Sequence, residues 1–335
     1  MPRTLNPPPP QAPSLGSASN EARALLFRSI HNPIITAAHL PFPGQCCFNS
    51  GAVRVGEEII MVLNCWDAEW VPRFLVARSR DGIHFEIGRD TIAKPPQEYP
   101  YIGHSDGIFD TRITTLEGHH YITYNVSSSL GGRIRLLRTA DFESFEDLGF
   151  ITSVDHRNCV IFPGTFNGFY ARLERPNGEG TTGGDIYLSY SPDLIFWGRT
   201  QLVLQKGTRY WESCKIGPGA PPIRTAAGWL VLYHGCRQHM NGIMYSAGAM
   251  LLDLEDPSKV IGKMRACLMW PETDYEFRGN VPQVVFPTAA VAGFRQDELL
   301  VYYGAADSSV CLATLSIQDL VDRCLADGPC LPGEE

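Results

Sequence analysis

Long apolar runs and basic charge are both scarce in this chain of 335 residues. No segment approaches the roughly 18 consecutive apolar residues of a membrane-spanning helix, so we expect no membrane partner. Asp and Glu number 36 against 28 Lys and Arg, and the net charge of -8 argues against nucleic acid as the main partner. The chain contains no G-x-x-x-x-G-K-[ST] loop and no H-E-x-x-H motif, so nucleotide hydrolysis and zinc proteolysis have no support.

Paired cysteine motifs are missing too, although the chain holds 10 cysteines. No C-x-x-C pair occurs, so we expect no zinc site and no other bound metal. Cys46 and Cys47 are adjacent, and several other cysteines lie within or beside apolar strands. This distribution fits reduced, buried thiols in a cytoplasmic protein better than it fits disulfides.

The N-terminus has no basic region followed by an apolar stretch, so we expect no secretory signal. Residues 1–20 are rich in Pro, Ser and Ala, and we expect them to be disordered, or to pack on a neighbouring subunit in a homo-oligomer. With 44% hydrophobic and 19% charged residues, the chain has the composition of a globular protein. We expect a single catalytic domain over residues 21–335.

A turn with a fixed Asp recurs along the chain. Three copies are plain and two are weaker: Ser79–Phe85, Thr139–Phe145, Ser191–Trp197, Leu254–Pro257 and Ile317–Leu320. Their Asp residues are spaced by 60, 52, 63 and 63 residues: Asp81, Asp141, Asp193, Asp256 and Asp319. A period of this size that carries strands predicts an all-β, five-bladed β-propeller, which gathers equivalent strand ends around one axis.

Five segments rich in β-branched and aromatic residues open the repeats as expected strands. They are 56–62, 118–124, 168–173, 228–234 and 297–303. Helical periodicity is confined to a short helix near residues 19–28 and a C-terminal turn near 317–325. The residues just after the strands are unusually polar for the interior of a blade: Asn64, Asn125, Arg175, His234 and Asp307. If the strands superpose, these side chains line a central cleft.

Asp110 stands out because it lies between Phe109 and Arg112, directly before a strand. A partly desolvated carboxyl group there could act as a general acid. From the local sequence alone, an Asp–Arg ion pair that closes a turn is the commoner arrangement.

Several cationic and phenolic side chains follow strand ends further along the chain: Arg157, Arg175, Lys215, His234 and Tyr245. A guanidinium group offers a planar fork that matches phosphate oxygens. For any single arginine, solvation at the surface is the commoner explanation. Gathered around one axis, the set predicts an anion pocket in an otherwise acidic protein.

These motifs resemble glycoside hydrolase family 130, the inverting mannoside phosphorylases. The resemblance runs from about His31 to Asp319. The matching segments are Phe48–Ala52, Ala77–Gly82, Asp110–Thr114, Arg157–Asn158, Phe162–Pro163, Arg175–Pro176, Lys215–Gly217, Tyr233–Gly235, Leu251–Val260, Val284–Pro287 and Tyr303–Asp307. The family fold is a five-bladed β-propeller, which agrees with the repeat count.

The resemblance implies roles for the matched residues. Asp110 would be the proton donor, acting through the 3-hydroxyl of the bound mannosyl unit. The implied phosphate-binding set is Arg157, Arg175, Lys215, His234 and Tyr245. The implied sugar-binding set is Asn49, Ser50, Asn64 and Asp307. The reaction would be phosphorolysis of a β-mannoside to α-mannose 1-phosphate, with inorganic phosphate as co-substrate and no cofactor.

The chain departs from the family pattern at two places. The usual Asp-Pro-Arg is replaced by Asp110-Thr111-Arg112, which removes a proline from the turn that carries the acid. Relatives usually carry a sugar-subsite arginine at the position of Asn64. Trp66 and Trp70 nearby could supply stacking instead, although a Trp beside a strand is more often simple packing.

The resemblance therefore implies an inverting phosphorylase. Its substrate would be β-1,4-mannosyl-glucose, mannosyl-N-acetylglucosamine or a mannooligosaccharide. Phosphate attacks directly and needs no base, whereas an inverting hydrolase must activate water. Hydrolytic relatives lack the basic set, so its retention favours phosphorolysis. A β-mannoside hydrolase (glycosidase) of the same fold and a non-catalytic glycan-binding propeller remain the alternatives.

Overall fold

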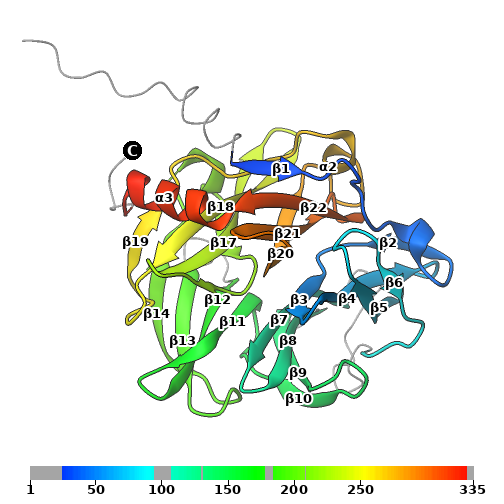
Figure 1. Ribbon diagram of the computed structural model, residues 1–335, viewed down its shortest axis with the longest axis horizontal. Helices are drawn as coiled ribbons and strands as arrows, with labels where there is room; N and C mark the ends of the chain where they lie inside the picture. The colour runs from blue at the N-terminus through cyan, green and yellow to red at the C-terminus, as the bar shows by residue number, and fades with distance from the viewer. Residues whose placement is uncertain (1–24, 94–106, 130, 178–183, 208, 330–335) are drawn as a thin grey trace, which may run out of the picture.

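The computed structural model describes residues 25–93, 107–129, 131–177, 184–207 and 209–329. Within these residues, five antiparallel sheets stand around a common axis (Figure 1). This arrangement confirms the predicted all-β, five-bladed propeller. The N-terminal segment 1–20, expected to be disordered, lies outside the described residues.

The blades, A to E, follow one another along the chain, and in each the strand named first lies nearest the axis. Blade A holds β2 (Gly44–Cys47), β3 (Gly51–Val55), β4 (Glu58–Asp67), β5 (Pro72–Ser79) and β6 (Glu86–Ile87). Blade B holds β7 (Ile108–Leu116), β8 (His119–Ser128), β9 (Gly131–Thr139) and β10 (Glu146–Phe150). Blade C holds β11 (His156–Phe166), β12 (Phe169–Pro176), β13 (Ile186–Ser191) and β14 (Gly198–Leu204).

Blade D holds β15 (Lys215–Pro218), β16 (Ile223–Arg224), β17 (Trp229–His239), β18 (Gly242–Leu252) and β19 (Val260–Lys263). Blade E holds β20 (Val285–Ala292), β21 (Glu298–Ala305), β22 (Ser309–Ser316) and β1 (Leu26–Arg28). The described helices are short: η1 (Ala37–His39), η2 (Tyr210–Glu212), α2 (Asp274–Phe277) and α3 (Ile317–Asp327).

The outer strand of blade E comes from the beginning of the chain. In Figure 1, β1 lies along β22, and the two pair in antiparallel register from Leu26 opposite Leu315. The short helix expected near residues 19–28 is therefore wrong over its described part. The reason is the free edge of β22, which offers backbone partners to a strand with Leu26 buried and Phe27 exposed. The C-terminal turn expected near 317–325 is a helix, α3.

The repeated Asp holds the turn that follows the third strand of a blade. Its Oδ1 accepts the two N–H groups found two and three residues further on, at 2.8–2.9 Å, in the copies at Asp81, Asp141 and Asp193. The weaker copies are built differently. Asp253 takes this role in place of Asp256, and Asp319 lies in the first turn of α3, which Ser316 caps.

The strands expected to open the repeats are the second strands of the blades: β4, β8, β12, β17 and β21. An innermost strand precedes each of them. Because the second strand is buried on both faces, its apolar sequence is the more conspicuous one. The predicted repeat therefore has the right number of units, but each unit begins one strand too late.

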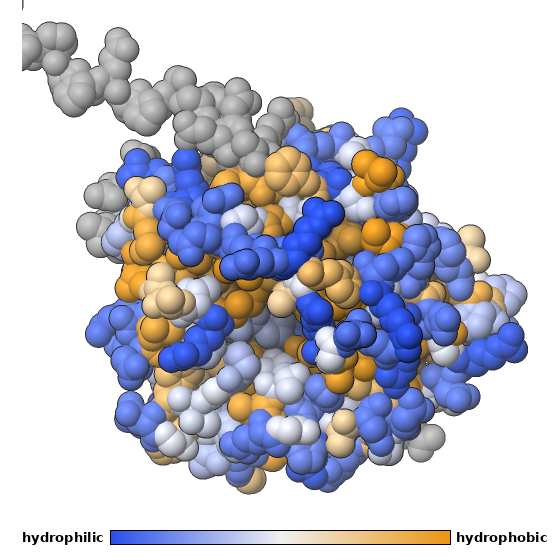
Figure 2. Space-filling model, viewed as in Figure 1, coloured by the Kyte–Doolittle hydropathy of each residue, from blue (hydrophilic) through white to orange (hydrophobic). Residues whose placement is uncertain are grey.

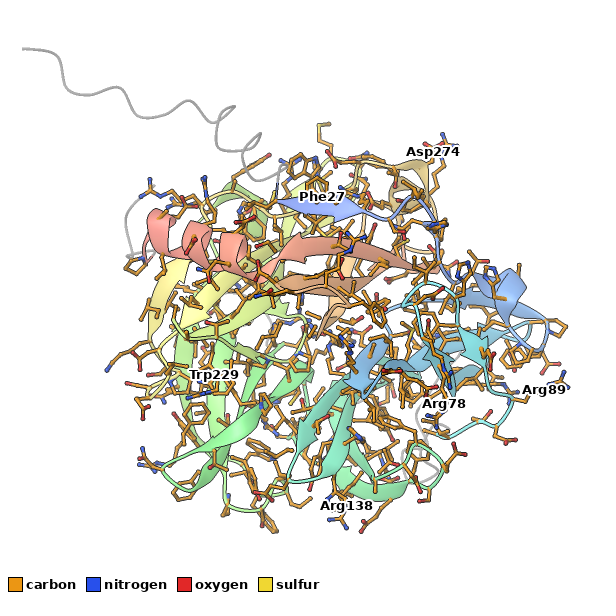
Figure 3. All side chains as sticks on the ribbon, viewed as in Figure 1. Phe27, Arg78, Arg89, Arg138, Trp229 and Asp274 are labelled. Atoms are coloured by element: carbon orange, nitrogen blue, oxygen red, sulfur yellow. The ribbon has the colours of Figure 1, made fainter. Side chains whose placement is uncertain are left out.

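Five clusters of buried apolar side chains hold the ring together, and each fills the space between two neighbouring blades. Between blades C and D, Trp229 (labelled in Figure 3) packs against Phe162 and Phe166, with ring centres 5.3 and 5.7 Å away. Hydrophilic side chains cover much of the face seen in Figure 2. The apolar interfaces fix the angles between blades and so position the ends of the inner strands.

The innermost strands are interrupted near one end of their blades. Around Asp110, β7 contains one more residue than the facing part of β8, and around Asn158, β11 contains one more than the facing part of β12. Asn49 lies in the break between β2 and β3. These three residues have φ values of 61°, 56° and 46°. A bulge of this kind turns a side chain out of the regular alternation, and such strained residues cluster at functional sites.

Candidate active site

A cavity of about 120 Å³ lies where the interrupted strands meet. Its polar lining comes from all five blades: Asn49, Asp110, Arg157, Asn158, Arg175, Lys215, Tyr245 and Asp307. Its apolar lining consists of Phe48, Phe109, Val284 and Phe286. Acidic, cationic and aromatic groups therefore face one another across a small space near the axis.

Two asparagine amides hold the carboxylate of Asp110. Asn49 Nδ2 donates to Oδ1 at 2.8 Å, and Asn125 Nδ2 donates to Oδ2 at 2.8 Å. Arg112 Nη1 donates to the main-chain oxygen of Asp110 at 2.6 Å but lies 3.9 Å from Oδ2. Arg112 thus fixes the turn through the backbone, while the carboxylate is turned into the cavity. The geometry favours a functional acid over the turn-closing ion pair.

Asp307 is the second carboxyl group of the cavity and shares a donor with Asp110. Asn49 Nδ2 also lies 3.3 Å from Asp307 Oδ1, so one amide bridges the two acids. Burial, followed by the negative charge of Asp110, raises the pKa of Asp307 from 3.8 to about 7. The two acids are therefore electrostatically coupled, and Asp307 can hold a proton near neutral pH.

Three cations face these acids across the cavity: Arg157, Arg175 and Lys215. Within the described residues, none of them has a carboxylate partner within ion-pair distance. Burial lowers the pKa of Lys215, and the charges of Arg175 and Arg157 lower it further. Cations gathered without an ion-pair partner form a site that an anion would stabilise.

A hydrogen-bonded network joins Asp110 to Arg175. Beyond its bond to Asp110, Asn125 accepts the backbone N–H of Asn158 at 3.2 Å. With its amide oxygen turned toward Arg175, Asn158 accepts from Nη1 at 2.9 Å and from Nη2 at 3.2 Å. Arg175 Nη1 also lies 2.9 Å from His234 Nε2. The acid and Arg175 are therefore held by one continuous set of hydrogen bonds.

His234 contacts Arg175 on the side away from the cavity and holds its guanidinium group in place. It is fully buried, and burial, followed by the charges of Arg175 and Lys215, moves its pKa well below the usual value. The neutral imidazole can accept a hydrogen bond from Arg175 through Nε2. Gly217 makes this contact possible, because a Cβ there would lie 2.5 Å from the His234 ring and 3.2 Å from Arg175 Nη1.

Seven of the ten residues expected in the site line the cavity: Asp110, Arg157, Arg175, Lys215, Tyr245, Asn49 and Asp307. The other three, His234, Ser50 and Asn64, are buried behind its wall. Ser50 Oγ accepts the backbone N–H of Asn64 at 3.0 Å and so ties the inner strand to β4.

Sequence reasoning placed Asn125 among the polar residues around the central cleft, but it assigned neither Asn125 nor Asn158 a part in catalysis or binding. The aromatic lining of Phe48, Phe109 and Phe286 was also missed, because an aromatic residue in a strand usually indicates core packing. In the described part of the chain, no three His, Cys, Asp or Glu side chains are grouped as a metal site requires. No helix among these residues is long and apolar enough to cross a membrane.

Comparison with known proteins gives a consistent result. A family model for beta-1,4-mannooligosaccharide phosphorylase, glycoside hydrolase family 130, matches residues 32–325. A beta-1,4-mannooligosaccharide phosphorylase of Ruminococcus albus is 33% identical over 315 residues, covering 90% of this chain and 91% of that protein. A 4-O-beta-D-mannosyl-D-glucose phosphorylase of Bacteroides fragilis is 26% identical over 330 residues, covering 88% of this chain and 83% of that protein. The solved beta-1,2-mannobiose phosphorylase of Listeria innocua, in complex with beta-1,2-mannobiose, superposes with a TM-score of 0.81 at 27% identity, covering 90% of this chain and 99% of that one.

Proposed function

Because the chain belongs to glycoside hydrolase family 130, we propose that it cleaves β-mannosides by inverting phosphorolysis. The products are α-mannose 1-phosphate and the sugar released from the cleaved bond. One observation carries this proposal: an acid held by two amides faces three cations that have no carboxylate partner among the described residues.

The cations suit phosphate as the nucleophile. We assign phosphate binding to Arg157, Arg175, Lys215 and Tyr245, with His234 fixing Arg175 from behind. An anion held there is aimed at the anomeric carbon and can attack without a base, because the cations bind it already ionised. The bond from the anomeric carbon to the acceptor oxygen breaks as the bond to phosphate forms.

The acid suits the departing sugar. Asp110 gives its proton, through the 3-hydroxyl of the mannosyl unit, to the oxygen that leaves, and regains a proton from solvent. Asn49 and Asp307 hold the mannosyl ring, and Ser50 supports Asn49 from the adjoining position. No metal or organic cofactor has a part in this scheme.

The competing function is hydrolysis on the same fold. An inverting hydrolase needs a second carboxylate across the sugar ring from the acid, to activate water. The other carboxyl group of the cavity, Asp307, shares Asn49 with Asp110 and so lies beside the acid. The opposite wall carries cations, which favour phosphate over water as the attacking group.

The test is the reverse reaction. The purified protein is incubated with α-mannose 1-phosphate and a panel of acceptors, namely glucose, N-acetylglucosamine, mannose and β-1,2- and β-1,4-mannobiose, and released phosphate is measured. Release that depends on one class of acceptor supports the proposal and identifies the acceptor. Release of free mannose from β-mannosides at an equal rate with and without phosphate would establish the hydrolase instead.

We also propose that the protein works in the cytoplasm. The nine cysteines among the described residues are all unpaired, although Cys47 and Cys65 lie opposite each other on neighbouring strands. Unpaired thiols at such short range suit a reducing compartment. Fractionation of cells that produce the protein would test this location.

A further inference from the structure

An aromatic wall leads from the cavity to the surface of blade A. It consists of Phe48, Trp66 and Trp70. Phe48 lines the cavity and packs with Trp66 in one buried cluster. Trp66 meets Trp70 edge to face, with ring centres 6.1 Å apart. The three rings therefore form a continuous contact from the interior of the site to a side chain that is 45% exposed.

Trp70 is held in position by a rigid turn. The hairpin between β4 and β5 is fixed by Asp67, which accepts the N–H groups of Glu69 and Val71 at 3.0 and 2.9 Å and pairs with Arg73 at 2.6 Å. Trp70 itself has φ of 62°, a conformation that bulky residues seldom adopt. A large apolar ring kept exposed at a strained position suggests that the exposure serves a ligand.

Polar groups on the same stretch of β4 also lack partners. Trp66 is only 8% exposed, yet its indole Nε1 has no acceptor among the described residues. Asn64, two residues earlier on the same face of the strand, is fully buried, and in the described part of the chain neither its amide nitrogen nor its amide oxygen has a hydrogen-bond partner. Buried polar groups nearly always find partners, so a buried indole donor that lacks one among the described residues, beside an aromatic platform, suggests a hydroxylated ligand.

We propose that the Phe48–Trp66–Trp70 wall is the acceptor subsite, which binds the sugars beyond the cleaved bond. This inference rests on the proposed phosphorolysis. The cavity holds the acid and the cations and therefore takes the mannosyl ring and phosphate, so the rest of the substrate must leave along a wall. Pyranose rings present an apolar C–H face that stacks on indole, while their hydroxyls accept from Nε1 of Trp66. The substrate is accordingly a β-linked oligosaccharide with at least two sugars on the acceptor side.

The experiment measures how the reverse reaction depends on acceptor length. Wild-type protein, Trp70→Ala and Trp70→Phe are assayed with α-mannose 1-phosphate and with mannose, β-mannobiose or β-mannotriose in whichever linkage the wild type accepts. We expect the wild-type KM to fall about tenfold from the monosaccharide to the longer acceptors. Trp70→Ala should remove this gain, Trp70→Phe should keep part of it, and the KM for α-mannose 1-phosphate should stay constant.

The control is Phe196→Ala, which removes another exposed ring (74% exposed) from an outer turn of blade C and should change no KM. Melting temperatures check that the variants fold. An unchanged length dependence in Trp70→Ala would overturn the acceptor subsite, even if the wild type is a phosphorylase. If the wild type does not turn over, calorimetric titration with β-mannotriose still decides. Binding at least fivefold weaker in Trp70→Ala supports the subsite, and equal or absent binding refutes it.

Discussion

At the scale of single residues, the most consequential contact is the pair of amides on Asp110. Both donate to the carboxylate, so they orient it, and each of its oxygens accepts a hydrogen bond in the free protein. An Asn at position 110 would have the same shape but would turn one NH₂ group toward an NH₂ donor. The two amide donors therefore require a group that accepts hydrogen bonds through both oxygens, and a side chain of the same size is not sufficient.

Asp110→Asn should lower turnover steeply and leave sugar binding largely intact. Loss of a general acid typically lowers the rate about 10²–10⁴-fold. Phosphate release in the reverse reaction and calorimetric binding of mannobiose check the two halves of this prediction. Parallel loss of binding and turnover would mean that Asp110 has a structural role instead.

Asp307 makes stability depend on pH. Because its pKa is raised to about 7, the folded protein keeps a proton that the unfolded chain loses near pH 4. The stability that this group contributes is complete below about pH 4 and is lost as the pH rises through 7. Asp307→Asn does not titrate, so its free energy of unfolding relative to wild type should increase between pH 5 and pH 8. Urea unfolding at the two pH values measures this difference, and an equal difference at both would refute the raised pKa.

At the scale of elements, the site depends on bonds between neighbouring strands. Asn125 of β8 holds both Asp110 of β7 and the backbone of Asn158 in β11. Asn125→Ala should lower kcat about tenfold or more, because the Asp110 carboxylate loses one of the two donors that orient it. Steady-state phosphorolysis measures kcat, and melting temperatures check that the variant folds. An unchanged kcat would mean that Asn125 does not orient the acid.

Gly217 of β15 sets the distance between blades C and D at the cationic side of the site. Gly217→Ala should push His234 and Arg175 apart and raise the KM for phosphate, while the KM for the mannoside changes little. The matched control is Gly198→Ala in β14, where a Cβ would meet no atom of the described residues within 4 Å. The two KM values are measured by varying phosphate at a fixed mannoside concentration and then the mannoside at a fixed phosphate concentration, and only Gly217→Ala should change the first. Equal effects of Gly217→Ala on both KM values would indicate a general distortion.

The sequence allowed the number of blades, the second strand of each and most cavity residues to be predicted. These strands are apolar on both faces and bounded by turn residues, so their pattern is strong. The breaks in the inner strands could not be predicted, because a left-handed φ at Asn49 or Asp110 depends on contacts with other blades. The same holds for Ser50 and His234, which a linear pattern cannot distinguish from residues that face the cavity.

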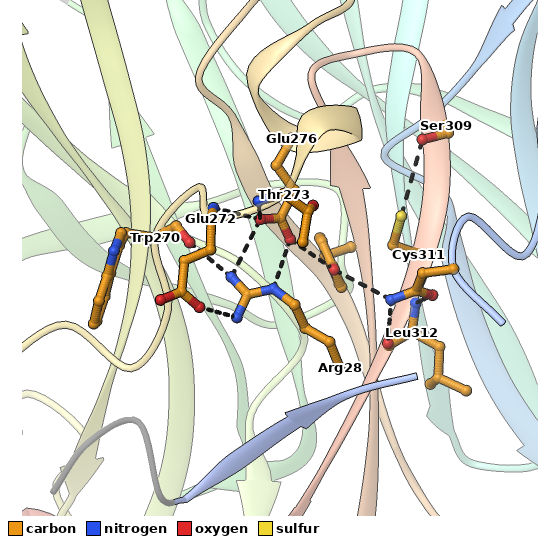
Figure 4. Close-up of polar contacts among 10 residues, drawn as sticks. Arg28, Trp270, Glu272, Thr273, Glu276, Ser309, Cys311 and Leu312 are labelled. Atoms are coloured by element: carbon orange, nitrogen blue, oxygen red, sulfur yellow. Dashed lines mark hydrogen bonds and ion pairs between the residues drawn. The ribbon is translucent and has the colours of Figure 1, made fainter. Parts of the chain in front are cut away.

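At the scale of the whole molecule, closure of the ring depends on the segment that carries β1. Figure 4 shows Arg28 bonded to Glu276 Oε1 at 2.8 Å, to Glu272 at 2.7 Å and to the carbonyl oxygen of Trp270 at 2.7 Å. Glu276 is fully buried and also accepts from the hydroxyl of Tyr303 at 2.9 Å. These bonds fasten β1 to the loop that joins blades D and E.

Arg28→Ala should therefore destabilise the protein by about 3 kcal/mol, because it leaves the buried Glu276 carboxylate without its cation. Arg138→Ala serves as the control: Arg138 lies at the outer edge of blade B (Figure 3) and pairs with Glu146 in an exposed ion pair. Urea unfolding should detect a large change in the first variant and almost none in the second. Similar changes in both would mean that the Arg28 cluster does not close the ring.

The pairing of β1 with β22 also affects when the ring can close during synthesis. A ribosome adds about 5–20 residues per second, so β1 emerges roughly 15–60 s before the strand that it will pair with. During that interval blades A to D can form in order, but the ring stays open and its first strand has no edge to join. The molecule therefore becomes a closed propeller only after β22 has been made.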